Sequence, residues 1–250
     1  MIHVSITPEI LFTPFGFPIT NTLLTAWIVM AFLIVFALAV SRNYRFVPGK
    51  LQNAVEALLE GLINFFETIA GSREKVIRFF PVVATIFIFV LSANWFGILP
   101  GVGSIGFREA EEGGEAFLPI FRSVNSDLNM TLALALVVVM LTHIFGLAVV
   151  GVGHHIGKFI NFKSPIRFFM GILELIGEFA RIVSFSFRLF GNVFAGEVLL
   201  VIITFLVPYV APTPFLGLEL FVGLIQALIF SVLAMMFLSA ATELHETQIH

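Results

Sequence analysis

The chain has 250 residues, of which 59% are hydrophobic and 12% charged, and its formal net charge is -3. Soluble proteins carry roughly 25% charged residues, so this composition excludes a water-soluble surface and favours an integral membrane protein. The chain has no cysteine, which excludes disulfides and cysteine-ligated metal, and its dispersed basic residues form no nucleic-acid-binding patch. We expect neither a cofactor nor a metal ion.

The N-terminal third predicts one spanning helix and one helix of another kind. Residues 1–22 lack the regions of a signal peptide and are predicted to lie outside the membrane. Residues 23–40 form an uncharged apolar run of one bilayer thickness, which indicates the first span. Residues 51–70 predict an amphipathic helix, because its three glutamates fall on one stripe. We interpret it as interfacial or bound to a partner.

The middle of the chain predicts two further spans, at residues 76–99 and 128–152. The first ends in a tryptophan that suits a membrane interface. Between them, residues 101–127 are glycine-rich and acidic, so we expect a solvated loop. Residues 154–163 are expected to form a short basic loop.

The basic residues predict the orientation in the membrane. Lys and Arg gather in residues 42–50, 73–78 and 158–167, whereas the N-terminal segment has none. The positive-inside rule therefore places those three segments in the cytoplasm and the N-terminus outside. Helix parity places the acidic C-terminus in the cytoplasm too. These features suit a multi-pass protein of a bacterial inner membrane.

The last third predicts a long helical hairpin. Residues 166–207 contain no proline and would extend roughly 60 Å as continuous helix, about twice the hydrocarbon thickness. Several prolines then turn the chain before a second helix at residues 215–243. Both lengths fit a steeply tilted, membrane-embedded hairpin. The predicted fold is thus a single all-α membrane domain over residues 1–250, in which upright spans and the amphipathic helix accompany this hairpin.

The first hairpin helix carries a narrow polar stripe. Five side chains fall on it in a regular helix: Glu174, Glu178, Arg181, Arg188 and Asn192. Glu197 points away from this stripe, and on the second helix Glu219 and Gln226, seven residues apart, share a face. Ionisable side chains at membrane depth are costly and mark ion or proton paths.

Arg188 is the strongest candidate for a functional residue. No acid lies three or four positions from it, and its polar helical neighbours are Ser184 and Asn192. Its counter-charge must therefore come from elsewhere in the bundle or from another chain. Because arginine keeps its proton in proteins, Arg188 is a fixed cation, whereas carboxyl groups can relay protons.

Other polar residues keep an alternative interpretation. Glu178 and Arg181, three positions apart, fit a purely structural ion pair equally well. His143 is as suited to a bond with a neighbouring helix as to a proton relay. The GxGxxG pattern that begins at Gly101 lacks a strand-turn-helix context, and the histidines of the His245–His250 tail have the wrong spacing for a zinc site.

The segment Ser184-Phe-Ser-Phe-Arg188-Leu-Phe-Gly-Asn192-Val-Phe-Ala-Gly-Glu197 closely resembles the signature of the a subunit of F-type ATP synthases. Further matches lie at Asp127 to Leu134, at Asn94 to Pro100 and at Leu224 to Phe230. The resemblance covers the chain from about residue 80 to its C-terminus, and the arginine motif is highly specific.

This resemblance implies a proton-conducting stator subunit that is not an enzyme by itself. Arg188 would face the essential carboxylate of each c subunit and prevent a proton leak between two half-channels. By position, Glu197 and Glu219 would line the outside half-channel. Asn192 and Gln226 would lie near the arginine, with Glu174 and Glu178 toward the cytoplasmic route. Many relatives have a histidine at one position of the Glu197 and Glu219 pair, whereas here both are glutamate.

The implied partners are the c-subunit ring, b-type peripheral stalk subunits, the rest of the ATP synthase and membrane lipid. Two other classes of protein compete with this interpretation. A stand-alone secondary ion transporter would use the same intramembrane charges, but the sequence has no internal repeat and no discontinuous half-helices. An intramembrane hydrolase would need a buried nucleophile with a base, and no such pair stands out.

Overall fold

The computed structural model describes residues 7–42, 45–99, 101–111, 114–159, 164–208 and 210–242, and of residues 108–111, 114–116, 154–156 and 158 it describes the backbone alone. Its helices within these ranges are α1 (Asn21–Arg42), α2 (Lys50–Ala70), α3 (Arg73–Ile98), α4 (Leu128–Val150), α5 (Val152–Phe159), α6 (Pro165–Leu206) and α7 (Pro212–Thr242). Five of the described helices, α1, α3, α4, α6 and α7, are long and apolar enough to cross a membrane. The expected all-α integral membrane fold is therefore confirmed.

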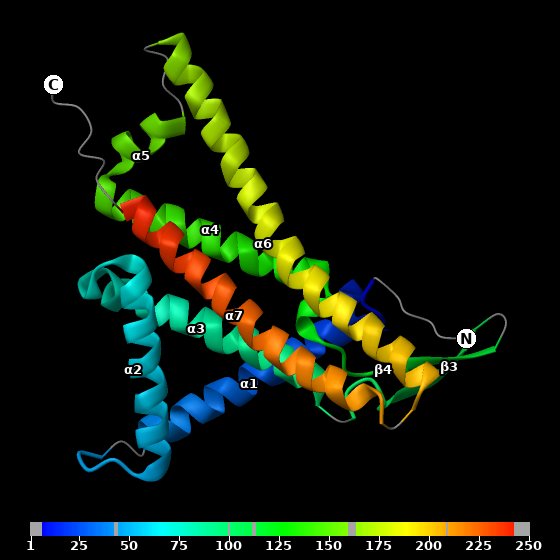
Figure 1. The fold of residues 1–250 in the computed structure, drawn as a ribbon. Helices are drawn as coiled ribbons and strands as arrows, with labels where there is room; N and C mark the ends of the chain where they lie inside the picture. The colour runs from blue at the N-terminus through cyan, green and yellow to red at the C-terminus, as the bar shows by residue number, and fades with distance from the viewer. Residues whose placement is uncertain are drawn as a thin grey trace.

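Two small antiparallel sheets accompany the helices at one end of the bundle (Figure 1). Strand β1 (Ile10–Phe12) pairs with β2 (Ile19–Thr20), and β3 (Gly106–Glu111) pairs with β4 (Gly114–Pro119). Short 3-10 helices, η1 (Pro14–Gly16) and η2 (Val124–Ser126), lie in the same parts of the chain. None of these strands or turns was expected from the sequence. Strands β1 and β2 and the 3-10 helices are too short for a hydrophobic period, and the six-residue strands β3 and β4 do not alternate apolar and polar residues.

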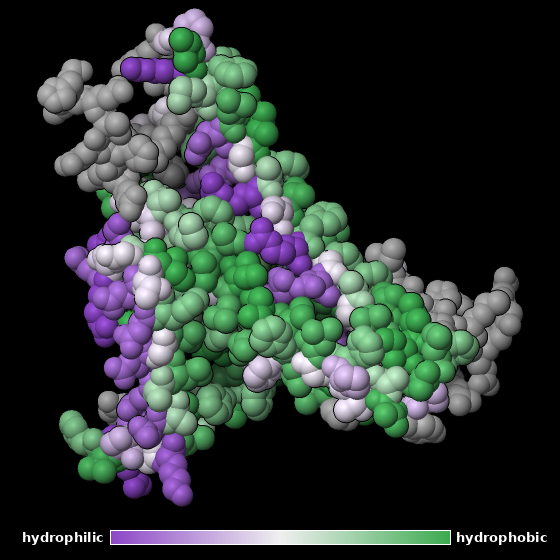
Figure 2. Space-filling model, viewed as in Figure 1, coloured by the Kyte–Doolittle hydropathy of each residue, from purple (hydrophilic) through white to green (hydrophobic). Residues whose placement is uncertain are grey.

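The core lies between α3, α4, α6 and α7. Phe79, Val83 and Val90 of α3 are fully buried, as are Ala234 and Met235 of α7. Small residues in these helices let the backbones approach closely, which is how membrane helices associate in the absence of a water-driven hydrophobic effect. The face of the bundle seen in Figure 2 is mainly apolar, as lipid contact requires, apart from hydrophilic residues along α6.

Helix α2 runs crosswise to α1 and α3 at the end of the bundle where α1 ends and α3 begins (Figure 1). It buries Leu62 and Phe66 in the main core and ends at Gly71, whose φ of 69° closes the helix in a left-handed conformation. Because α2 lies across the spanning helices, it cannot cross a bilayer together with them. This placement fits an interfacial helix.

Helices α6 and α7 form an open hairpin. They meet near their connecting turn and then diverge, so that α7 packs along α3 and α4 while α6 crosses α4 (Figure 1). Helix α6 has 42 residues and a length of about 63 Å at 1.5 Å per residue. Helix α7 begins at Pro212, before the expected residue 215, because a proline in the first helical turn costs no intrahelical hydrogen bond.

The expectation of a solvated loop over residues 101–127 is wrong for its C-terminal part. Arg122, Ser123 and the residues of η2 are buried. Asp127 accepts a hydrogen bond from the hydroxyl of Thr22 at 2.8 Å and caps α4 through the backbone N–H of Asn129 at 2.9 Å. These bonds tie the segment to α1 and α4, which accounts for its burial.

The expected basic loop at residues 154–163 is also wrong in part. The chain forms α5 up to Phe159, and residues 160–163 lie outside the described residues. Helix α4 ends at Val150, two residues earlier than expected, because Gly151 takes a positive φ of 87°. The His245–His250 tail lies outside the described residues as well.

Candidate functional site

Helix α6 carries the candidate residues on both sides of Arg188. Figure 2 shows hydrophilic side chains in a broken band along α6 within a mainly hydrophobic face. Glu178 precedes Arg188 by ten residues and Glu197 follows it by nine, which correspond to about 15 Å and 14 Å along a helix. The polar groups are therefore spread over much of a membrane thickness, with the arginine between them.

Arg188 is exposed on the surface of the bundle. The buried side chains of Phe185 and Leu189, on a neighbouring face of α6, hold the helix against the core. Its Nη2 atom donates to Oγ of Ser184 at 3.4 Å, and within the described residues no carboxylate lies at ion-pair distance from it. The sequence-based expectation that its counter-charge is absent from its own helix agrees with this geometry.

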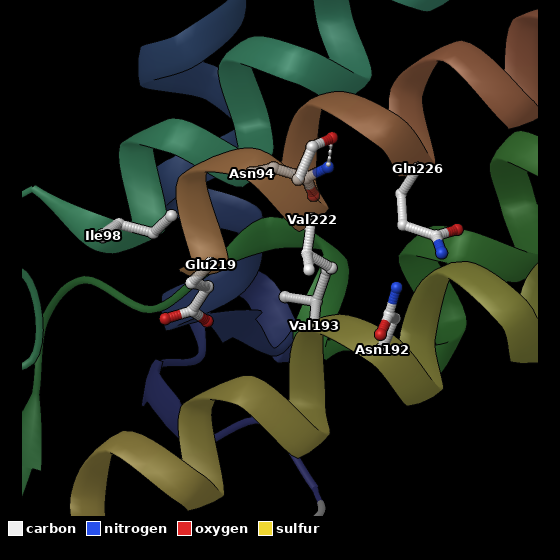
Figure 3. A pocket seen from close by; sticks show the side chains of 8 residues that line it. Asn94, Ile98, Asn192, Val193, Glu219, Val222 and Gln226 are labelled. Atoms are coloured by element: carbon white, nitrogen blue, oxygen red, sulfur yellow. Dashed lines mark hydrogen bonds between the residues drawn. The ribbon is translucent and has the colours of Figure 1, made fainter. Parts of the chain in front are cut away.

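A small pocket opens between α3, α6 and α7 (Figure 3). Eight residues line it: Asn94, Ile98, Asn192, Val193, Glu219, Val222, Gly223 and Gln226. In Figure 3 the amides of Asn192 and Gln226 point toward each other from α6 and α7, while Val193 and Val222 lie between this pair and Glu219. The pocket thus brings together three residues that the sequence had placed on two separate helices.

Asn94 holds the wall of this pocket together. Its Nδ2 atom donates to the carbonyl of Gly223 at 2.9 Å, and its Oδ1 atom accepts from Nδ2 of Asn125 at 2.7 Å. Next to it, Nε1 of Trp95 donates to the carbonyl of Leu220 at 3.1 Å. Side chains of α3 therefore bond backbone carbonyls of α7 beside Glu219, and buried amides of this kind fix helix positions.

Glu219 lies against α6 at Gly196. A Cβ atom at position 196 would be 2.7 Å from Oε1 of Glu219, so only glycine leaves space for the carboxylate. The other oxygen, Oε2, is shielded from solvent and has no hydrogen-bond partner among the described residues. A shielded carboxylate oxygen without a donor is unfavourable as an anion, which suits a group that takes up a proton.

Glu197 follows Gly196 on α6 and bonds a residue from another part of the chain. The Nε atom of Arg122 donates to its two carboxylate oxygens at 3.1 Å and 3.4 Å. The Arg122 side chain is only 7% exposed and that of Glu197 29%. Glu197 also directly follows Gly196, the residue against which the Glu219 carboxylate lies.

A second charged cluster lies on the other side of Arg188. Nη1 of Arg181 donates to both oxygens of Glu178 at 2.9 Å, and the Arg181 guanidinium lies 4.0 Å above the ring of Phe237. Nε2 of His143, from α4, is 3.8 Å from Oε2 of Glu178. His143 therefore lies beside the polar stripe of α6. The charge of Glu178 is neutralised by Arg181. Glu174 is exposed.

Three of the residues that build this site were not candidates on sequence grounds. Arg122 counted only as a basic residue of an acidic loop, and Asn94 and Asn125 carried no role. For Arg122 a signal was present, because apolar residues from Phe117 to Phe121 precede it almost without interruption. An arginine in such surroundings is commonly buried with an acidic partner.

The arrangement suits proton transfer better than catalysis on a bound molecule. Among the described residues no group of three or more His, Asp or Glu side chains could hold a metal ion. The glycines from Gly101 to Gly106 form turns that lead into β3, so they do not precede a helix as a nucleotide-binding loop would. What remains is carboxyl and amide groups on both sides of a fixed cation.

Comparison with known proteins agrees with this chemistry. A model of the family described as ATP synthase A chain matches residues 23–239. A protein of Campylobacter jejuni subsp. doylei named ATP synthase subunit a is 34% identical over 212 residues, which cover 84% of each chain. Proteins of the same name from Geotalea daltonii and Desulfosudis oleivorans are 32% and 34% identical, and the matches cover 87% of this chain and 85% and 86% of theirs.

Proposed function

The chain belongs to the ATP synthase subunit a family, the proton-translocating component of the membrane sector, and we propose that Arg188 separates two polar proton routes within it. A subunit of this family takes part in ATP synthesis without catalysing the reaction itself, and it works with the rest of the complex. The family match gives no support to the alternative of a stand-alone secondary ion transporter.

The guanidinium of Arg188 is exposed and has no acidic partner among the described residues, and this observation carries the proposal. An arginine at membrane depth without an acidic partner is costly, so a partner chain must supply the negative charge. We assign this role to the carboxylates of a ring of c subunits that moves past α6. Each ring carboxylate loses its proton to meet Arg188 and regains one after passing it.

The route from outside runs through the pocket between α6 and α7. Glu219 is its proton-accepting group, and Asn192 and Gln226 continue it toward Arg188 as uncharged hydrogen-bonding groups. The route on the cytoplasmic side runs past Glu178 and the exposed Glu174. Because arginine does not release its proton, Arg188 prevents direct transfer between the two routes.

The same proposal fixes the orientation and the further partners. The positive-inside rule favours the cytoplasm for the basic segments around α2 and before α6, so we infer that the β-strands lie outside and the C-terminus inside. The protein is then a multi-pass component of a bacterial inner membrane. We infer that b-type peripheral stalk subunits contact α2 and the adjoining ends of α1 and α3, because this end of the bundle faces the cytoplasm in that orientation.

The energy available to this arrangement is set by the membrane potential. Each proton that crosses 100 mV releases about 2.3 kcal/mol. A direct leak past Arg188 would dissipate this energy without moving the ring. A fixed cation between the two routes couples every transferred proton to one step of the ring.

The test uses the complete ATP synthase in inverted membrane vesicles with Arg188→Ala. We expect normal amounts of subunit a in the assembled complex but loss of ATP-driven proton pumping, measured by quenching of a pH-sensitive dye. Arg188→Lys controls for charge, and it should retain little pumping because lysine can release its proton. Pumping at the wild-type rate by Arg188→Ala would overturn the proposal.

A further inference from the structure

The two carboxylates near the outside end of α6 and α7 do not have equal surroundings. Glu197 receives the guanidinium of Arg122 in a forked contact: Nε reaches both oxygens, and Nη2 reaches Oε2 at 3.5 Å. Glu219 has one shielded oxygen without any partner among the described residues. One glutamate is therefore held in place by a cation, and its neighbour is free to take up a proton.

Arg122 is itself held by two other parts of the chain. Its Nη1 atom donates to the carbonyl of Thr7 at 3.3 Å, and its backbone N–H donates to Oγ1 of Thr25 on α1 at 3.3 Å. A guanidinium buried to this degree needs an acidic partner, because an uncompensated buried charge is costly. A forked contact also fixes the direction of the carboxylate, which a lysine would not do.

The ion pair lies next to Glu219 in the fold. Glu197 follows Gly196, the residue at which a Cβ atom would lie 2.7 Å from Oε1 of Glu219. The pocket neighbours of Glu219 from α3 and α7, such as Asn94 and Gln226, carry no charge. The charge that faces Glu219 is therefore that of Glu197, offset by Arg122.

We propose that Arg122 is a positioning residue of the outside proton route: it holds Glu197 as a fixed counter-charge, so that Glu219 alone carries the incoming protons. The proton binds a carboxylate oxygen of Glu219 and later leaves it for the ring, while Glu197 keeps its contact with Arg122 throughout. This inference rests on the proposed function. In this arrangement the incoming proton binds Glu219 alone and does not pass through both glutamates in turn. Glu197 and Arg122 neutralise each other beside it.

The experiment compares single and double charge removal in purified ATP synthase reconstituted in liposomes. ATP synthesis is driven by a fixed potassium diffusion potential, and the pH on the outside face of subunit a, the liposome lumen, is varied. We expect Arg122→Gln and Glu197→Gln each to slow synthesis at least tenfold. The rate of synthesis in the double variant should recover to within about threefold of wild type, because both charges of the ion pair beside Glu219 are then removed together.

The dependence of the synthesis rate on lumen pH provides a second readout. If Arg122 only stabilised the fold, the half-maximal pH would not change. Arg122→Gln removes the positive charge beside Glu197 and Glu219 and keeps both negative ones, so the half-maximal lumen pH should rise. Glu197→Gln removes a negative charge beside Glu219 and keeps the positive charge of Arg122, so the half-maximal pH should fall. Shifts of opposite sign are expected from the two single variants.

A matched control distinguishes the positioning of Glu197 by Arg122 from a general anchoring of the buried segment around η2. Thr22→Val removes the hydrogen bond to Asp127 in the same region without touching Glu197, and it should leave the pH profile unchanged. A double variant as slow as Glu197→Gln would overturn the inference while the outside route stands. Wild-type rates and profiles in all three Arg122 and Glu197 variants would also overturn the inference, whereas the proposed function is decided separately by Arg188→Ala.

Discussion

Gly196 of α6 faces the carboxylate of Glu219 on α7 with no space for a side chain between them. A Cβ atom at position 196 would lie 2.7 Å from Oε1 and 3.1 Å from Cδ of Glu219. The contact is made by the far end of a flexible side chain and not by the α7 backbone. A larger residue would therefore displace the carboxylate without separating the two helices.

Gly196→Ala should consequently impair proton conduction while the complex still assembles. Alanine favours helix over glycine by about 1 kcal/mol, so stability should not fall through the backbone. We expect ATP-driven proton pumping to slow several-fold, because Glu219 leaves its position in the pocket. Gly217→Ala is the matched control on α7, since a Cβ there meets no atom within 4 Å. Equal pumping by the two variants would show that the position of Glu219 is unimportant.

Glu219→Gln should have a larger effect than Gly196→Ala. Glutamine fills the same space, but it cannot take up and release a proton in the pocket. We expect ATP-driven pumping to fall at least tenfold at every pH between 6 and 9, on the order of the contribution of one proton-transfer group. Glu219→Asp tests the same point with the carboxyl group retained, and it should keep part of the activity. An unchanged rate in Glu219→Gln across this range would exclude Glu219 from the route.

Much of this fold follows from local sequence patterns. Each long apolar run became a helix, because a membrane leaves a backbone no alternative to internal hydrogen bonds. The stripe with Arg188 follows from helical periodicity alone, which holds for α6 because it has no proline after its first residue. The absence of an acid near Arg188 was likewise visible from the sequence.

The pairings between distant residues were not predictable in the same way. Arg122 and Glu197 are 75 positions apart, and no periodicity connects a loop residue with a helix residue. The burial of residues around η2 depends on the hydrogen bond that Thr22 donates to Asp127 and the one that Asn94 accepts from Asn125, and these form only when α1 and α3 are already packed. The resemblance to a known family could assign Glu197 to a route but could not supply its partner.

Asn94→Ala should weaken the outer end of the bundle. The change leaves the carbonyl of Gly223 without its donor and Nδ2 of Asn125 without its acceptor, at positions that are shielded from water. Loss of such buried partners costs about 1–3 kcal/mol. We expect a lower midpoint for thermal dissociation of subunit a from the detergent-solubilised complex. Thr85→Ala on the exposed face of α3 removes only a bond to its own helix and should leave the midpoint unchanged.

The ion pair of Glu178 and Arg181 could be structural or functional, because its two hydrogen bonds of 2.9 Å are compatible with both roles. If the pair only stabilises α6, Arg181→Met combined with Glu178→Gln should restore pumping that either single change reduces, since the double change leaves no unpaired charge. We expect no such recovery. Glu178 also meets His143 of α4, and a proton that leaves the ring needs a titratable group on the cytoplasmic side. Pumping in the double variant should therefore stay as slow as in Glu178→Gln, whereas recovery to the wild-type rate would make the pair structural and leave Glu174 as the remaining carboxylate for that route.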